Sequence, residues 1–482
     1  MSVFEDKRVF GIKKRNCGGV TTAGQVCANE VILWTIFMLP VNVVIHGAGQ
    51  CLVFIGLFAG NVIGWIFLSK RMNSYTTISK KKIHNAPELF GARYDSVLLK
   101  NFVSFVWIIA LGLILVSVLK VIVSVVAYFM ETSETICLLT IVLFLILSTI
   151  LIDNRLMGII KTIVFIMVIF ACLSIIGMVF YKMDVTEVLD NYRRARLPGG
   201  TSVYLNILYF DGEPVSVCKA ISMIGIGLGC ISMPLMYKGV ISIKNVKELD
   251  KGRIWAIIFE GFTIISTSAL ALFVLPVIYP LKVRENMNSF QVYNLIMKKL
   301  LNGIPYEYII RSIILLVFIA AVVVMLESFM RNISEHIRGM LPSLSGIGVE
   351  VKLVIDILVV LFTGILVFLP AEYASFDREA MIVGSWNLCS ATLAAPLMFA
   401  LLYRNSTKAG AYAGMIFGAL VCFVWNWVPL IEGCTMYRYT SLNGGVIGFA
   451  ISFFMCAFVG RFTKKNSEEE LLVFDRMVED QA

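Results

Sequence analysis

Long apolar segments recur along the whole chain, separated by short polar ones. A helix of roughly twenty apolar residues, rising 1.5 Å per residue, crosses a hydrocarbon layer about 30 Å thick. A backbone exposed to lipid must satisfy its own hydrogen bonds, so these segments are expected to be helices. The pattern predicts twelve spans, at residues 19–45, 47–69, 98–130, 134–153, 157–181, 216–237, 254–280, 309–330, 351–370, 379–403, 409–429 and 444–462.

Composition supports the same fold class, an all-α integral membrane protein. Hydrophobic residues make up 59% of the 482 and charged residues 15%, against about 45–50% and about 25% in soluble domains. The three histidines, His46, His84 and His336, lie near span ends or in loops. With no nucleotide-binding loop beside them, we do not expect an enzyme.

The distribution of basic residues predicts how the chain is oriented. The twelve spans divide the polar segments into two alternating sets, one holding 26 Lys and Arg and the other 9. The basic set is expected to be cytoplasmic, which places both termini in the cytoplasm of a cell (plasma) membrane protein. The net charge of +9 is then an orientation signal, and nucleic-acid binding is not expected.

The sixth span carries the clearest helix-breaking cluster, the GIGLG run at 225–229 followed by Pro234. Each glycine weakens a helix by about 1 kcal/mol, and interrupted spans occur where the freed backbone lines a binding cavity. We therefore predict an unwound site, with close helix packing through small residues as the alternative.

Ionisable residues inside spans form the second functional signal, because a charge near the bilayer centre is costly unless it is paired, protonated or solvated. Glu30 lies at mid-depth in the first span, four residues before Trp34 and ten before Pro40. The others are Lys120, Lys161, Glu260, Glu327 and Asp356. Lys161 and Asp356 lie near span ends, where snorkelling toward the interface is an equal explanation.

Interruptions in spans one and six would occupy matching places in two five-helix halves. An odd number of spans inverts the second half, which is the arrangement of alternating-access carriers. The expected organisation is a basic tail at 1–18, repeats at 19–181 and 216–403, an extracytoplasmic linker at 182–215, two supporting helices at 404–462, and an acidic tail at 463–482 that is able to form a short amphipathic helix.

Three segments resemble motifs of the sodium/solute symporter family, most closely those of bacterial sodium/proline symporters. They are the sixth span with its basic loop (225–253), the PELFGARY stretch (87–94), and the run from Ala395-Pro396 through Arg404, Thr407, Gly410, Ala413-Gly414 and Gly418. The segment Arg15-Asn16-Cys17-Gly18 resembles the turn that follows a leading helix in the family. That extra helix is expected to be absent here.

The resemblance implies a five-plus-five inverted-repeat core with discontinuous helices one and six, and uptake of a small organic solute driven by sodium. The family's sodium ligands would correspond to the carbonyls of Ala28 and Val31, with Glu30 at the functional acid. The hydroxyl pair of helix eight falls on Val324 and Met325, or in a shifted register on Ala320 and Ala321. Neither register supplies a side-chain oxygen, so the sodium site is expected to be degenerate.

Charged and substrate-side positions depart from the family as well. Lys161 falls where the family has an Asp near the sodium path, and its ammonium group could replace a cation; Glu327 could supply a carboxylate oxygen or carry a proton. Ile226 and Cys230 replace aromatic residues of the proline carriers, so proline is not the expected solute. The substrate-site candidates are Trp34, Gly225, Ile226, Gly227, Gly229, Cys230 and Lys120, the last as a group that attracts a carboxylate.

Three functions are consistent with these residues. The first is a sodium-coupled symporter for an amino-acid-like or carboxylate solute, and the second is a sodium-independent or proton-linked carrier that uses Lys161 as a surrogate cation. The third is a transport-inactive membrane sensor on the same fold, because a fold alone does not decide function. The expected partners are a small organic solute and the lipid bilayer, with Na+ or H+ in place of any cofactor; the oligomeric state stays open.

Overall fold

The structure, a computed structural model, describes residues 10, 15–79, 81, 83–195, 197, 199–281, 287–342, 348–375, 377–431, 433–463 and 466–480. Most of the predicted tail at 1–18 lies outside the described residues. The helices of the spans are α1 (Gly19–Ile32), α2 (Leu39–His46), α3 (Leu52–Ile63), α4 (Ser69–Ile78), α6 (Val97–Met130), α7 (Glu134–Leu151), α8 (Asn154–Lys182), α11 (Val217–Gly225), α12 (Leu228–Ser232), α13 (Pro234–Ser242), α14 (Val246–Ile278), α16 (Glu307–Met340), α17 (Val349–Tyr373), α18 (Arg378–Cys389), α19 (Ala395–Leu402), α20 (Lys408–Trp427) and α22 (Gly444–Phe462).

Shorter elements connect the spans. They are α5 (Ala86–Arg93), α9 (Val185–Arg194), α10 (Thr201–Tyr204), α15 (Ser289–Leu301), α21 (Met436–Thr440) and α23 (Glu468–Glu479), with a 3₁₀ turn at Ala48–Cys51. The strands of the described chain form two small antiparallel hairpins, β1 (Tyr209–Phe210) with β2 (Glu213–Pro214) and β3 (Pro429–Ile431) with β4 (Cys434–Thr435).

Eleven described helices are long and apolar enough to cross a membrane, and one bent pair brings the number to twelve. This confirms the predicted number of spans. Helix α22 begins and ends at the predicted residues, whereas α14 begins eight residues earlier and α16 ends ten residues later than expected. Both extensions are polar, and each contains ion pairs, as in the contacts of Arg338 with Asp356 at 2.9 Å and of Arg253 with Asp250 at 3.1 Å, so the helices continue past the apolar segment.

The discontinuity expected in the first span takes the form of a π-helical segment, Leu33–Met38, between α1 and α2. Pro40 lies two residues after its end, in the first turn of α2. Proline has no N–H and its ring clashes with the carbonyl four residues before it, which a widened π turn accommodates. Another π segment, Ser390–Ala394, precedes Pro396 in the tenth span in the same way.

The sixth span is broken as predicted. Helix α11 ends at Gly225, α12 covers one turn, and α13 begins at Pro234, with a bend of 41° between the segment Val217–Ser232 and α13. Proline suits the first position of a helix because the N–H it lacks has no partner there.

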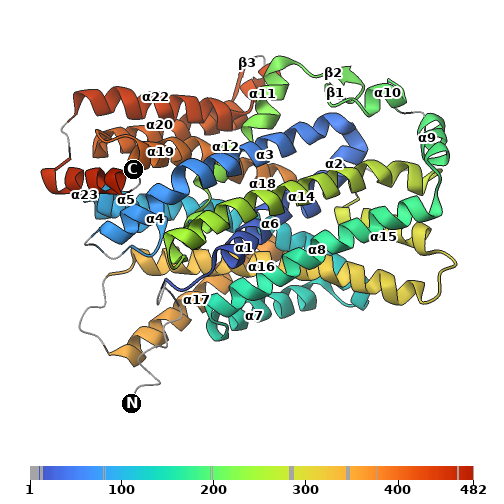
Figure 1. The fold of residues 1–482 in the computed structure, drawn as a ribbon, viewed down its shortest axis with the longest axis horizontal. Helices are drawn as coiled ribbons and strands as arrows, with labels where there is room; N and C mark the ends of the chain where they lie inside the picture. The colour runs from blue at the N-terminus through green and yellow to red at the C-terminus, as the bar shows by residue number, and fades with distance from the viewer. Residues whose placement is uncertain are drawn as a thin grey trace.

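The helices run broadly along the long axis of the molecule, with α20 and α22 on one edge, α7 and α17 on the opposite edge, and α1 between them (Figure 1). One end carries α9, α10 and the β1–β2 hairpin, and the other carries α4, α5 and α23. Helix α23 is held there by Phe474, which is buried with its ring 4.9 Å from the guanidinium of Arg93. The predicted amphipathic tail helix is thus part of the packed structure.

Candidate functional site

The break in the sixth span exposes backbone groups that side chains from three other spans satisfy. Glu30 of α1 accepts a hydrogen bond from the backbone N–H of Met236, in the first turn of α13, at 3.2 Å. A carboxylate suits this place because the first N–H groups of a helix lack intrahelical partners and carry partial positive charge. Glu30 and the glycine break, predicted separately, therefore belong to one site.

Two tryptophans bind the carbonyls of the same break. Trp386 of α18 donates from Nε1 to the carbonyl of Ile226 at 2.9 Å, and Trp107 of α6 donates to Ser232 at 3.0 Å. A buried indole N–H normally finds an acceptor, so these residues fix the shape of the break. Neither tryptophan was predicted from the sequence as part of the site, although the position of both inside apolar spans was a usable signal.

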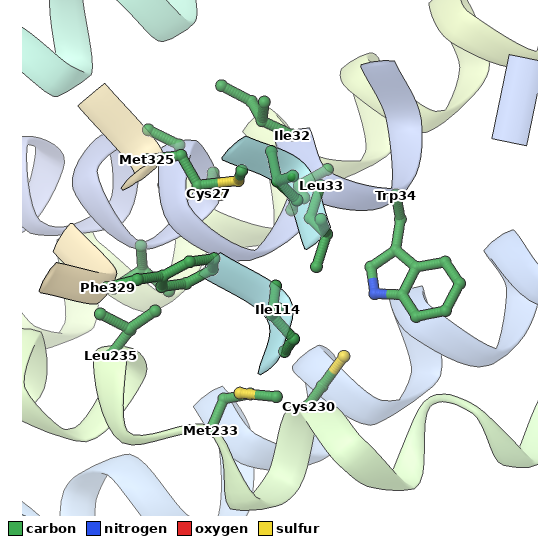
Figure 2. Packing of buried hydrophobic residues seen from close by; sticks show 14 of the residues in the cluster. Cys27, Ile32, Leu33, Trp34, Ile114, Cys230, Met233, Leu235, Met325 and Phe329 are labelled. Carbon is green, nitrogen blue, oxygen red and sulfur yellow. The ribbon is translucent and has the colours of Figure 1, made fainter. Parts of the chain in front are cut away.

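The substrate-site candidates on spans one and six lie together, beside Trp386 of span ten. Trp34 is buried and packs edge-on against Trp386, with ring centroids 5.4 Å apart, and its Nε1 has no partner among the described residues. Figure 2 shows the nitrogen edge of Trp34 on the side toward Cys230 of the broken span. Spans one and six therefore present an indole donor and a thiol to the same interior region.

The three glycines of the break also allow close packing. A methyl group at Gly227 would lie 1.8 Å from the carbonyl oxygen of Gly56 in α3, and one at Gly229 would lie 2.0 Å from the indole nitrogen of Trp386. Gly225 faces Val446 of α22 at 2.2 Å by the same measure. Both interpretations of this motif thus apply, because the backbone is interrupted and is also in contact with its neighbours.

Lys120 lies apart from this group. Its ammonium donates a hydrogen bond to the carbonyl of Ala374, at the end of α17. The geometry therefore gives Lys120 a bond to the loop after the ninth span, whereas the other substrate-site candidates gather around the break in the sixth.

The ion-site candidates of α16 divide into apolar packing residues and a charged group. Ala321 and Met325 are buried in the apolar core, where Figure 2 shows Met325 with Cys27 and Phe329. Val324 is half-buried and its carbonyl accepts a bond from the hydroxyl of Ser328 at 3.3 Å.

A side-chain oxygen does lie between α16 and α1, one turn beyond the expected position. The hydroxyl of Ser328 donates to Oδ1 of Asn29 at 2.5 Å. Neither Asn29 nor Ser328 was among the residues predicted from the sequence. The candidate carbonyls of Ala28 and Val31 lie in the regular helix α1, and that of Val31 accepts a bond from the hydroxyl of Thr35 at 2.7 Å.

Lys161 and Glu327 form a buried ion pair between α8 and α16, with Nζ 2.7 Å from Oε2. Arg331 binds the other oxygen of Glu327 at 2.6 Å. The guanidinium of Arg331 also donates to the carbonyls of Ser148 and Ile152 at the end of α7, at 3.2 and 3.0 Å. Lys161 therefore points into the protein, and snorkelling does not explain it.

The fold and this site define the class of the protein, a multi-pass membrane protein with the architecture of a cation-coupled symporter. Over 94% of the chain it superposes on a Na+-coupled sialic acid symporter in a substrate-bound outward-open state (91% of that chain, TM-score 0.73, 15% identity). Over 96% it superposes on a nucleobase-cation-symport-1 family transporter in a closed conformation with bromovinylhydantoin bound (97% of that chain, TM-score 0.52, 11% identity). These likenesses confirm the predicted fold class, including its five-plus-five core.

Sequence comparison adds curated relatives. The chain is 23% identical to a sodium/proline symporter of Haemophilus influenzae over 96% of its own length and 90% of that protein. It is 24% and 25% identical to sodium/proline symporters of Staphylococcus aureus over 55% and 54% of its length, and it spans about half of them, 53% and 50%. No family model matches. The resemblance to bacterial sodium/proline symporters is confirmed, and with it the expectation that the protein is not an enzyme.

Proposed function

We propose that the protein is a secondary active transporter that imports a small organic solute by alternating access, coupled to a cation. It would act in the plasma membrane with both termini in the cytoplasm, and it would need no cofactor other than the coupling ion. The observation that carries this proposal is the contact of Glu30 with the first turn of α13. An acid on one interrupted span thereby binds the break in the other, at the place where carriers of this architecture hold solute and ion.

The proposed solute is amino-acid-like or a carboxylate. Trp34 supports this class, because a buried indole N–H without a protein partner calls for an acceptor oxygen on a ligand. The relatives of the chain are named for sodium and proline, whereas Ile226 and Cys230 give the region around the break a different surface. A solute other than proline, with an acceptor oxygen and an aliphatic body, fits these residues best.

The alternative is a sodium-independent or proton-linked carrier. The buried position of Lys161, with Nζ 2.7 Å from Glu327, supports it, because a fixed ammonium then joins α8 to α16 where a mobile cation would otherwise do so. Replacing Lys161 by Ala would abolish gradient-independent exchange under this alternative. Unchanged exchange in Lys161→Ala would retire the surrogate-cation role.

Uptake by the purified full chain in proteoliposomes tests these functions. A panel of radiolabelled amino acids and organic acids is offered under an inward sodium gradient, an inward proton gradient and no gradient. Accumulation that sodium stimulates supports the symporter and rejects the sodium-independent carrier. Absence of saturable uptake across the panel under all three conditions would reject transport in favour of a sensor.

A further inference from the structure

Helix α1 separates two small cavities whose linings have opposite charge. On one side, Asn29 faces a cavity that is also lined by Lys161, Lys238 and Arg331. On the other side, the next residue, Glu30, faces a cavity that is also lined by Glu260 of α14. The protein therefore supplies its own cations beside α8 and α16, and carboxylates beside α3 and α14.

The carboxylate cavity is closed by parts of four spans. Thr35 follows Glu30 in the first span, Asn61 comes from α3, Cys230 from the broken sixth span and Glu260 from α14. Asn61 donates from its amide to one oxygen of Glu260 at 2.8 Å. Glu30 and Glu260 are each only 2% exposed.

Acceptor oxygens in this cavity outnumber the donors. The second carboxylate oxygen of Glu30 and Oδ1 of Asn61 are buried and have no hydrogen-bond partner among the described residues. The hydroxyl of Thr35 donates its proton to the carbonyl of Val31 at 2.7 Å, which leaves only lone pairs for the cavity. The oxygens without a hydrogen-bond partner are thus available as ligands. A cation coordinated by their lone pairs would satisfy them.

No lysine or arginine lines this cavity in the part of the chain that the structure describes. The first turn of α13 offsets the charge of Glu30 in part, whereas the partner of Glu260 among the described residues is the neutral amide of Asn61. An isolated buried carboxylate is expensive. The charge balance therefore calls for a cation in the cavity itself.

We propose that this cavity binds a sodium ion, held by Glu30, Glu260, Asn61 and Thr35. Hard cations prefer carboxylate, amide and hydroxyl oxygens, which are the groups present. Divalent ions are less suitable, because calcium takes six to eight oxygens and magnesium an octahedron, and one oxygen of each carboxylate is already engaged. As the coupling site this proposal rests on the proposed transport function, whereas ion binding itself can be measured without transport.

The test is a sodium titration of the purified full chain in detergent, with choline replacing sodium at constant ionic strength and pH. The thermal midpoint is expected to rise saturably with sodium, because a ligand that binds only the folded state stabilises it. Glu260→Gln and Asn61→Ala should each raise the half-saturating sodium concentration at least about tenfold, the loss typical of a disrupted ligand shell. The matched control is Thr263→Val, one turn along α14, because the Thr263 hydroxyl donates to the carbonyl of Phe259 at 2.7 Å and Thr263 is not among the described residues that line the cavity.

The outcomes separate the two proposals. A wild-type midpoint that does not respond to sodium, or that responds to pH alone, overturns the sodium site. An unchanged sodium response in either folded variant also overturns it, and because the two substitutions lie on different helices, misfolding of one leaves the other informative. Sodium binding without solute uptake would refute transport and keep the site. Sodium-driven uptake with unaltered sodium dependence in Glu260→Gln would keep transport and refute the site.

Discussion

The buried triad of Lys161, Glu327 and Arg331 gives the sharpest prediction about stability. It holds two cations and one carboxylate, with the carboxylate in contact with both cations. Glu327→Gln leaves two buried cations facing a neutral amide. Lys161→Met leaves the Glu327–Arg331 pair, which is electrically neutral and still hydrogen-bonded. The first change should therefore destabilise the protein far more than the second.

The magnitudes follow from these charges. Removing one partner of a buried ion pair and leaving the other uncompensated costs about 3–5 kcal/mol, which we expect for Glu327→Gln. Lys161→Met should cost about 1 kcal/mol, the size of one buried hydrogen bond. The double variant should be more stable than Glu327→Gln alone, because the single remaining cation, Arg331, keeps its bonds to the carbonyls of Ser148 and Ile152.

Reversible unfolding in mixed micelles with increasing SDS measures these free energies. Lys81→Met is the control, because Lys81 pairs with Asp95 at 2.6 Å at an exposed site where an ion pair contributes about 1 kcal/mol or less. Equal losses in Lys161→Met and Glu327→Gln, or a double variant less stable than both, would refute the charge argument.

Three further predictions concern packing. Gly227→Ala should lower the stability of the protein by at least about 3 kcal/mol through overpacking against α3. The control Gly177→Ala, in open space on α8, should raise it by up to about 1 kcal/mol. Thermal unfolding compares the two variants, and equal midpoints would contradict the contact of Gly227 with α3. Trp386→Phe removes the donor to Ile226 at a cost of about 1–3 kcal/mol, so amide hydrogen exchange in the peptide 217–242 should become faster. An unchanged exchange rate would show that the bond does not stabilise the break. Phe474→Ala should release α23, because it removes about 3 kcal/mol of packing free energy. Limited proteolysis should then cut first after Phe462. A tail as resistant to the protease as in the wild type would contradict the docking of α23.

The spans could be predicted because apolar length is a local property of the sequence. The end of α16 could not, since its last turns are polar and their charges are paired by residues far along the chain, as Glu335 is by Lys238 at 2.7 Å. The sequence did carry a start signal for α14. Asn245 accepts a hydrogen bond from the backbone N–H of Glu248, which is a helix N-cap of the usual residue type and spacing. A prediction from hydropathy alone does not use this signal, and so it placed the start of α14 too late.

The site was predicted in parts whose contacts the sequence could not show. Glu30 and the glycine break were found separately, because 206 positions divide the acid from its partner Met236. The partnership of Asn61 with Glu260 likewise depends on how α3 and α14 pack. Ser328 was not predicted for a different reason. Moving the comparison with the family's helix eight by one helical turn brings a different residue to the same helix face, and the apolar pattern does not distinguish the two registers.

The contact of Gly56 with Gly227 bears on what a sequence search can retrieve. Where two main chains are in contact, the spacing of small residues is determined by the distance between the helices. It does not depend on the solute that is bound nearby. Chains that carry unlike molecules can share that spacing for the same steric reason. Glycine motifs of this kind therefore identify the fold. Information about the solute has to come from the side chains that the glycines allow to come close.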